Sequence, residues 1–236
     1  YRINDHGDQD AANSLLEINY LNTAQITDMT DMFRECRNVS LINADTWNTS
    51  NVKCLNCTFE YCTSLTELDL NNLDVSNVIY AWYLFGGCES LTRLLINNWN
   101  TESLQEMEYM FSYCGNLTEL DLSNWNTNNF VRLDYMFDHC EKLTTIGNVS
   151  NWNTKNVTCM RAMFNACFKL QSLNLSNWDV SNITDISIMF NACNALTTVG
   201  DLSNWDTSKI QQMPDVFNGC TSLKTVGDLS NWDTSN

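Results

Sequence analysis

Hydrophobic and polar positions repeat along this chain with a period of 26 or 27 residues. The stretch from Glu108 to Thr127 shows the pattern, with apolar residues first at spacings of three and four and then in the order L-x-x-L-x-L. Repetition at such a period is typical of solenoids, in which each repeat forms one structural coil. The sequence therefore predicts a stack of similar coils.

Three columns of apolar residues mark the repeats. The first is a phenylalanine column: Phe33, Phe59, Phe85, Phe111, Phe137, Phe164, Phe190 and Phe217. A cysteine follows three residues after each: Cys36, Cys62, Cys88, Cys114, Cys140, Cys167, Cys193 and Cys220. The third column runs from Trp47 to Trp232, with Leu73 in one place. We expect these structural ladders to stack from coil to coil in one continuous core.

Within each repeat the apolar spacing changes and predicts two elements. Met29, Met32 and Phe33 follow a helical spacing, which favours a short helix with one buried face. Leu120 and Leu122 alternate as in a strand. The predicted fold class is an α/β solenoid, a leucine-rich-repeat-like stack of about eight coils of 26–27 residues. Parallel strands would lie on one side and short helices on the other.

Three later repeats contain an extra glycine, at Gly147, Gly200 and Gly227. Glycine suits a one-residue bulge in a strand, because it adopts backbone conformations closed to other residues. Turn geometry elsewhere must come from Asn, Asp, Ser and Thr, whose side chains bond nearby backbone groups. We expect the asparagine column that includes Asn98 and Asn124 to form ladders between coils.

The motifs M-F-x-x-C, L-x-x-L-x-L and S-N-W-[ND]-T together resemble the BspA-type leucine-rich repeats, which are also catalogued as a mycoplasma family of unknown function. The resemblance covers about residues 13–236. Members are mostly predicted surface proteins of bacteria and some protists, and a few are implicated in adhesion to host proteins or other cells. The resemblance therefore implies an extracellular or cell-surface binding domain, and it implies no catalytic residue.

The domain organisation follows the repeat. Residues 1–12 form a polar N-terminal tail, and residues 13–236 form a single leucine-rich-repeat solenoid domain. Because the chain begins at Tyr1 rather than Met, we expect it to be an excerpt of a longer protein. The last residues stop just after a predicted strand, and solenoids need covered ends. A structural protomer that stacks through uncapped ends into a filament or larger surface assembly is therefore the alternative hypothesis.

Charge narrows the range of partners. The chain has 28 Asp and Glu against 12 Lys and Arg, which gives a net charge of −16. Nucleic acids and anionic membranes both attract basic faces, so neither is an expected partner. No apolar run approaches the roughly 20 residues of a membrane span, which argues against direct membrane insertion.

The outward positions of the predicted strands form the first candidate ligand-binding surface. They are polar and mainly acidic: Glu67, Asp69, Arg93, Glu119 and Asp121. Repeat proteins usually bind through such a face, and a basic partner or divalent cations would suit this one. The alternative is a solvated face that maintains solubility.

Aromatic residues on the predicted helix side form the second candidate surface. Tyr83, Tyr109 and Tyr135 share one repeat position, and Trp82 lies outside the tryptophan column. Aromatic side chains with polar tips are enriched at binding hot spots. The alternative is that they are ordinary surface residues of a repeat.

Neither the cysteines nor the histidines predict a reactive site. Ladder cysteines on a buried face behave as small hydrophobes, although disulfides between neighbouring coils are the alternative. Cys54 and Cys57 form a C-x-x-C without the second pair that a zinc site needs, so no metal or cofactor is predicted. Neither His6 nor His139 belongs to a nucleophile–base pattern.

The leading hypothesis is thus a non-enzymatic extracellular binding or adhesion module. It would present its polar, acidic repeat face to a protein or glycan ligand, or to other copies of itself.

Overall fold

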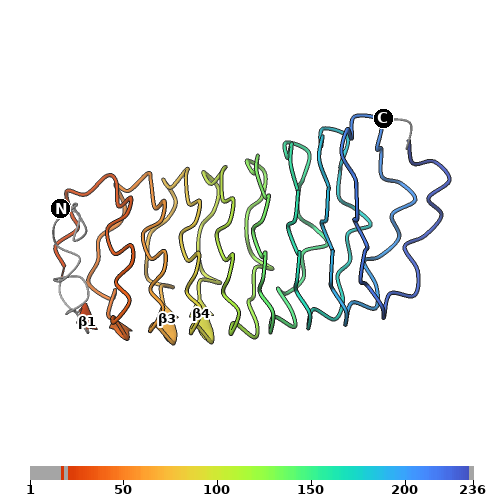
Figure 1. Ribbon diagram of the computed structural model, residues 1–236. Helices are drawn as coiled ribbons and strands as arrows, with labels where there is room; N and C mark the ends of the chain where they lie inside the picture. Colours follow the sequence, from red (N-terminus) through yellow and green to blue (C-terminus); the bar gives the residue numbers. More distant parts are fainter. Residues whose placement is uncertain (1–16, 19–20, 234–236) are drawn as a thin grey trace.

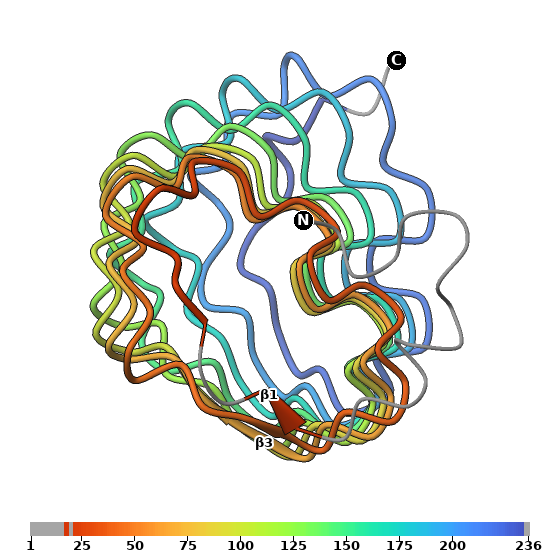
Figure 2. The same cartoon turned by 90° about the vertical axis from the view of Figure 1, so that its left-hand side faces the viewer.

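The computed structural model describes residues 17–18 and 21–233. In Figure 1 the coils lie side by side along one axis, from the N-terminal coils in red to the C-terminal coils in blue. Figure 2 looks along that axis, and the coils form stacked rings with the strands at one edge. The predicted solenoid is confirmed, whereas the predicted tail at residues 1–12 lies outside the described residues.

Short parallel strands line one side of the stack. β1 (Glu17–Ile18) pairs with β2 (Leu41–Ile42), and β3 (Glu67–Asp69) pairs with β4 (Arg93–Leu95). Further along the stack, pairing on this side is reduced to single parallel bridges, as between Glu119 and Thr145. Along β3 the central Leu68 is buried and its two neighbours are exposed, which is the alternation that the L-x-x-L-x-L motif predicts.

The predicted short helices are wrong, because the described residues contain no helix. Each M-F-x-x-C motif lies instead in a run of consecutive turns, here called a turn segment, such as residues 106–115. Two residues of each segment have positive φ, as Tyr109 (φ 57°) and Tyr113 (φ 58°) do. A right-handed helix cannot contain such residues, while a turn needs them at its third position when it is of type II.

Backbone hydrogen bonds explain why the turn segments are stable. Met110 N–H bonds Met107 within its own segment, at 3.2 Å. The alternate donors reach the next coil instead, as Phe111 N–H does to Met136 O at 2.9 Å. Consecutive turns advance by two or three residues and therefore produce nearly the same apolar spacing as a helix. The spacing was detected correctly, but the element it belongs to is different.

The predicted structural ladders form the core. Every phenylalanine of the column from Phe33 to Phe190 is buried, with Phe217 partly buried, and successive rings stack with centroids 5.3–5.7 Å apart. The tryptophan column is also buried from Trp47 to Trp205, with Leu73 in its predicted place. Five indole N–H groups donate to the preceding coil, as Trp99 Nε1 does to Leu70 O at 2.9 Å, whereas those of Trp47 and Trp152 have no hydrogen-bond partner.

The ladder cysteines are free thiols, so the disulfide alternative is not what the structure adopts. Each from Cys62 onward donates its S–H to the phenylalanine carbonyl of the preceding coil, as Cys114 does to Phe85 O at 3.2 Å. The thiols therefore have polar partners, which their apolar neighbours in the sequence did not indicate. The thiol is a second donor to a carbonyl group that also accepts a backbone N–H, as Phe85 O does from Cys88 N–H at 3.1 Å.

The predicted asparagine ladder exists in a different column. Asn129 Nδ2 donates to Glu102 O at 2.6 Å, and Asn156 Nδ2 donates to Asn128 O at 2.9 Å. This column lies five residues beyond Asn124, which is exposed. Side-chain amides thus connect neighbouring coils at the turn that follows the tryptophan ladder.

Candidate functional site

The five candidates of the strand face lie on one exposed surface. Glu67 and Asp69 belong to β3, and Arg93 belongs to β4 directly opposite Glu67. Arg93 and Glu67 form an ion pair with a 3.7 Å separation, and both side chains remain mostly exposed. Glu119 continues the same row in the next coil. An exposed pair of this kind stabilises the fold very little, so its groups stay available to a ligand.

A hollow of about 550 Å³ lies on this surface. Its lining comes mainly from residues 92–97 and 118–123, and includes Arg93, Glu119 and Asp121. Glu67 and Asp69 lie outside the lining. The structure therefore brings three of the five strand-face candidates into one concavity, with the other two beside it.

Two of the acidic candidates also shape the backbone. Asp121 Oδ1 accepts Ser123 N–H at 3.1 Å, and Asp69 Oδ1 accepts Asn71 N–H at 3.0 Å. Such bonds close the turn after the strand. The second oxygen of each carboxylate is not used in these bonds, so both residues combine a turn-forming role with an exposed charge.

The tyrosine candidates form a continuous stack on the turn segments. The Tyr83 and Tyr109 rings lie 4.3 Å apart with an interplanar angle of 6°, and Tyr109 and Tyr135 lie 4.5 Å apart. All three are half-buried and have φ between 53° and 58°. Because each ring covers the next, mainly ring edges are left for a ligand, and burial raises the pKa of Tyr83 and Tyr109. The stack therefore packs three successive turn segments against one another.

Trp82 ends the tyrosine stack on its N-terminal side. Its indole meets the Tyr83 ring edge-on at 5.9 Å, and 39% of its surface is exposed. Of the four aromatic candidates, it is thus the one with the most accessible ring. Tyr61, Tyr80 and Tyr113 are also exposed aromatic residues of the turn segments, and they were not among the candidates.

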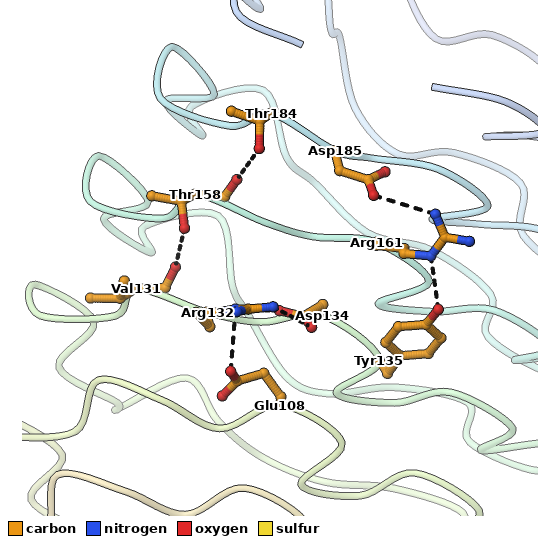
Figure 3. Close-up of polar contacts among 9 residues, drawn as sticks. All are labelled: Glu108, Val131, Arg132, Asp134, Tyr135, Thr158, Arg161, Thr184 and Asp185. Atoms are coloured by element: carbon orange, nitrogen blue, oxygen red, sulfur yellow. Dashed lines mark hydrogen bonds and ion pairs between the residues drawn. The ribbon is translucent and has the colours of Figure 1, made fainter. Parts of the chain in front are cut away.

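Charged side chains hold the other end of the stack, as Figure 3 shows. Arg161 Nε donates to the Tyr135 hydroxyl at 2.8 Å, while Arg161 Nη1 donates to Asp185 Oδ2 at 3.3 Å. In a neighbouring contact, the Arg132 guanidinium bonds both oxygens of Asp134 at 3.0 Å. The two Arg161 contacts connect three successive coils, because the 26-residue repeat aligns residues that are far apart in the sequence.

The C-x-x-C cysteines do not act as a pair. Cys54 Sγ lies 3.1 Å from the Thr30 hydroxyl, whereas the Cys57 thiol lies with carboxylate oxygens of Asp31 and Glu60, all within 4.8 Å of one another. Repeat alignment could have indicated this cluster, since Asp31 and Cys57 share one column.

The positively charged side chain of Arg34 lies beside this acidic cluster. Arg34 Nε lies 2.7 Å from Glu60 Oε2, and the guanidinium also approaches Asp31 at 3.5 Å. Burial is the main cause that raises the pKa of Glu60 and of the Cys57 thiol. A protonated thiol is a poor metal ligand, so the arrangement favours an internal ion pair over a metal site.

The part of the chain that the structure describes contains no helix long and apolar enough to cross a membrane.

Comparison with known proteins identifies relatives by sequence profile and by fold. The profile of the family described as "Mycoplasma protein of unknown function, DUF285" matches residues 8–117, 83–198 and 164–236. No curated protein matches the chain significantly. Similar solved structures include leucine-rich repeat proteins from Bacteroides ovatus (TM-score 0.41, 18% identity, 89% of this chain), T. pallidum (0.40, 19%, 90%) and Eubacterium ventriosum (0.42, 15%, 80%). The chain spans 66%, 73% and 58% of those proteins' own lengths.

Proposed function

This chain belongs to the family described as mycoplasma proteins of unknown function, DUF285, which agrees with its BspA-type motifs. Because the function of that family is unknown, we propose a function from the geometry of the chain itself. The protein is a non-enzymatic binding module of the cell surface. It holds a basic segment of a protein ligand against its acidic strand face.

The hollow on the strand face is the observation that carries this proposal. Its volume of about 550 Å³ lies within the range of ligand pockets, and its lining includes Arg93, Glu119 and Asp121. Regular strand spacing presents these side chains in rows, which suits an extended peptide better than a compact small molecule.

The charge of the surface favours a cationic ligand. Glu67, Asp69, Glu119 and Asp121 surround a single arginine, and that arginine is paired with Glu67. The net charge of −16 means that the chain as a whole also attracts cationic ligands. A cationic partner would thus be attracted at long range and then oriented by the row of carboxylates.

The experiment compares fluorescent octapeptides of net charge +4, 0 and −4. We expect only the +4 peptide to bind measurably, with affinity that falls as salt is raised, because added ions screen the attraction. In the variant Glu67→Lys, Glu119→Lys, Asp69→Asn and Asp121→Asn, its affinity should fall by at least about tenfold, which corresponds to roughly 1.4 kcal/mol. The asparagines keep the oxygen that closes each turn.

A matched control separates the site from the overall charge. The variant Glu102→Lys, Glu141→Lys, Asp74→Asn and Asp179→Asn makes the same change in net charge at exposed positions elsewhere. Its aspartates also close turns, through Ser76 and Ser181. An equal loss of affinity in both variants would show that the peptide responds to net charge alone, and the strand face would not be the site.

A further inference from the structure

We propose that the stack opens on its strand side at the boundary between residues 92–97 and residues 118–123, while the turn segments of the same coils stay joined. The hollow lies at this boundary, since its lining comes mainly from these two runs of residues. A peptide ligand that lies across the strand face closes the boundary, and this closing step rests on the proposed function.

Strand pairing is interrupted along the stack. β1 pairs with β2 and β3 pairs with β4, but β2 and β3 belong to separate sheets. The next pairing on this side is the parallel bridge between Glu119 and Thr145. On the strand side, the described residues from β1 to Thr145 therefore form three separate pairs of coils. The hollow lies between the second pair and the third.

The boundary after β4 lacks backbone hydrogen bonds. Arg93 N–H donates back to the preceding coil, to Thr66 O at 3.3 Å. Alternate residues of a strand direct their N–H groups to opposite edges, so those of Leu94 and Ile96 are directed toward residues 118–123. Neither N–H has a backbone acceptor among the described residues, although Leu94 and Ile96 are only 4% and 1% exposed.

The equivalent residues one coil later are bonded. Leu120 N–H donates to Thr145 O and Leu122 N–H donates to Ile146 O, both at 3.1 Å. Leu120 and Leu122 are 4% and 0% exposed, so the two places differ in hydrogen bonding and not in burial. A buried N–H without a partner is costly, whereas the same group in water is solvated. The strand side therefore opens more easily after β4 than at a paired junction.

Tryptophan contacts across the boundary are also long. The Trp99 and Trp125 rings stack with centroids 6.2 Å apart, against 5.8 and 5.9 Å in the other two stacked tryptophan pairs of the described residues. The Trp125 indole N–H donates to Ile96 O at 3.4 Å, whereas that of Trp99 donates to Leu70 O at 2.9 Å. These contacts would resist an opening of the boundary less than their counterparts elsewhere.

The turn segments hold the same two coils together. Tyr83 N–H donates to Glu108 O at 2.9 Å, and Gly87 N–H donates to Ser112 O at 2.7 Å. Just before the strands, a side-chain bond also joins the coils, from Asn116 Nδ2 to Glu89 O at 2.7 Å. The opening is therefore confined to the strand side.

The carboxylates of the proposed peptide site lie on both sides of the boundary. Glu67 and Asp69 belong to β3, in the pair of coils before it, while Glu119 and Asp121 belong to the pair after it. A cationic peptide that contacts carboxylates of both pairs spans the boundary and holds it closed. Because the peptide binds the closed form better, it lowers the population of the open form.

Hydrogen exchange of single amides in the free protein, followed by NMR, tests the opening without any ligand. After correction for intrinsic rates, we expect Leu94 and Ile96 N–H to exchange at least about tenfold faster than Leu120 and Leu122 N–H, because only the last two are hydrogen-bonded. A smaller difference would overturn the proposal.

A disulfide across the boundary tests the motion itself. Thr92 and Thr118 share one repeat position, both are exposed, and neighbouring coils lie within the Cα range of a disulfide. Oxidation of the variant Thr92→Cys with Thr118→Cys should slow exchange at Leu94 and Ile96 by at least about tenfold. The control Thr66→Cys with Thr92→Cys joins the paired strands β3 and β4. Unchanged exchange in the first variant, or equal slowing in the control, would overturn the proposal.

The octapeptide of net charge +4 tests the closing step. At saturation it should slow exchange at Leu94 and Ile96 by at least about tenfold, and the neutral peptide should leave it unchanged. If the +4 peptide binds without slowing this exchange, the closing step is wrong while the proposed function stands. If it does not bind, the closing step fails together with the proposed function, and exchange in the free protein still decides whether the boundary opens.

Discussion

Gly147 lies directly against Asp121 of the preceding coil, so closely that a Cβ on the glycine would be 2.5 Å from Asp121 Oδ1. The glycine also has a φ of 79°, which non-glycine residues rarely adopt. The same contact recurs between Gly200 and Asn174. The inserted glycine of the longer repeats thus accommodates both a backbone conformation and a neighbouring side chain.

Gly147→Ala should therefore lower the free energy of unfolding by about 2–3 kcal/mol, since the methyl group adds a collision to an unfavourable φ. Urea unfolding followed by tryptophan fluorescence measures the change. A cost below about 0.5 kcal/mol would mean that the coil moves freely away from Asp121.

The double variant Asp121→Ala with Gly147→Ala divides this cost between its two causes. Removal of the carboxylate relieves the contact with Asp121, but it leaves the unfavourable φ and a second close contact, 2.6 Å from the added Cβ to Ser123 Oγ. We expect a coupling energy of about 1 kcal/mol in a double-mutant cycle. Simple additivity of the two single changes would assign the whole cost to the backbone and to the contact with Ser123.

Phe111→Ala should cost about 3–5 kcal/mol, because it leaves a cavity within a closely packed ladder. The Phe111 ring is fully buried and stacks at 5.7 Å on Phe85 and at 5.3 Å on Phe137. Chemical denaturation measures the loss, with Tyr113→Ala as the exposed comparison in the same turn segment. Similar costs for the two variants would be inconsistent with the observed burial.

Thiol reactivity should distinguish ladder cysteines from the others. Of the eleven cysteines, only Cys54, Cys159 and Cys220 are partly exposed. Burial raises the pKa of the ladder thiols, to about 11 for Cys36, and so lowers the fraction of reactive thiolate. We expect Ellman's reagent to modify at most three thiols rapidly in the folded protein and all eleven after unfolding. Rapid modification of more than three would show that the ladder opens readily.

Stability should decrease as the pH rises above about 4.3, the ordinary pKa of glutamate. Burial is the main cause that raises the pKa of Glu108, with a further contribution from Asp134, while Arg132 acts in the opposite direction. The folded chain therefore holds a proton more tightly than the unfolded chain, and ionisation between the two pKa values reduces the free energy of unfolding. Glu108→Gln should make this decrease smaller. Thermal unfolding measured between pH 4 and pH 7, in steps of about one pH unit, would show the difference.

Glu106→Gln is the control for that pH profile, because it changes a neighbouring, half-buried carboxylate of the same turn segment. A profile for Glu108→Gln that coincides with that of the unmodified protein would rule out Glu108 as the cause.

The periodicity of the sequence was sufficient to predict the solenoid and its ladders. Residues such as Phe111 recur in register, and stacked coils are the arrangement that buries them all. The helices were predicted wrongly because Met107, Met110 and Phe111 have a spacing that suits both a helix and consecutive turns. The difference depends on the positive φ of Tyr109, and tyrosine is not a residue that normally indicates such a conformation.

The candidate site was predicted in part for a related reason. Alternation along the strands identified Arg93, Glu119 and Asp121 as neighbours on one face, and they do line one hollow. Contacts between columns could not be inferred in the same way. The Tyr135–Arg161 hydrogen bond and the position of Arg34 beside Glu60 depend on side-chain directions that only the folded coils determine.

The backbone bonds between turn segments give the stack a direction. In residues 106–115, the donors of Met107, Tyr109, Phe111 and Tyr113 all point to carbonyl groups of the following coil. One face of every turn segment therefore offers N–H groups and the other offers C=O groups, so the peptide dipoles add along the axis.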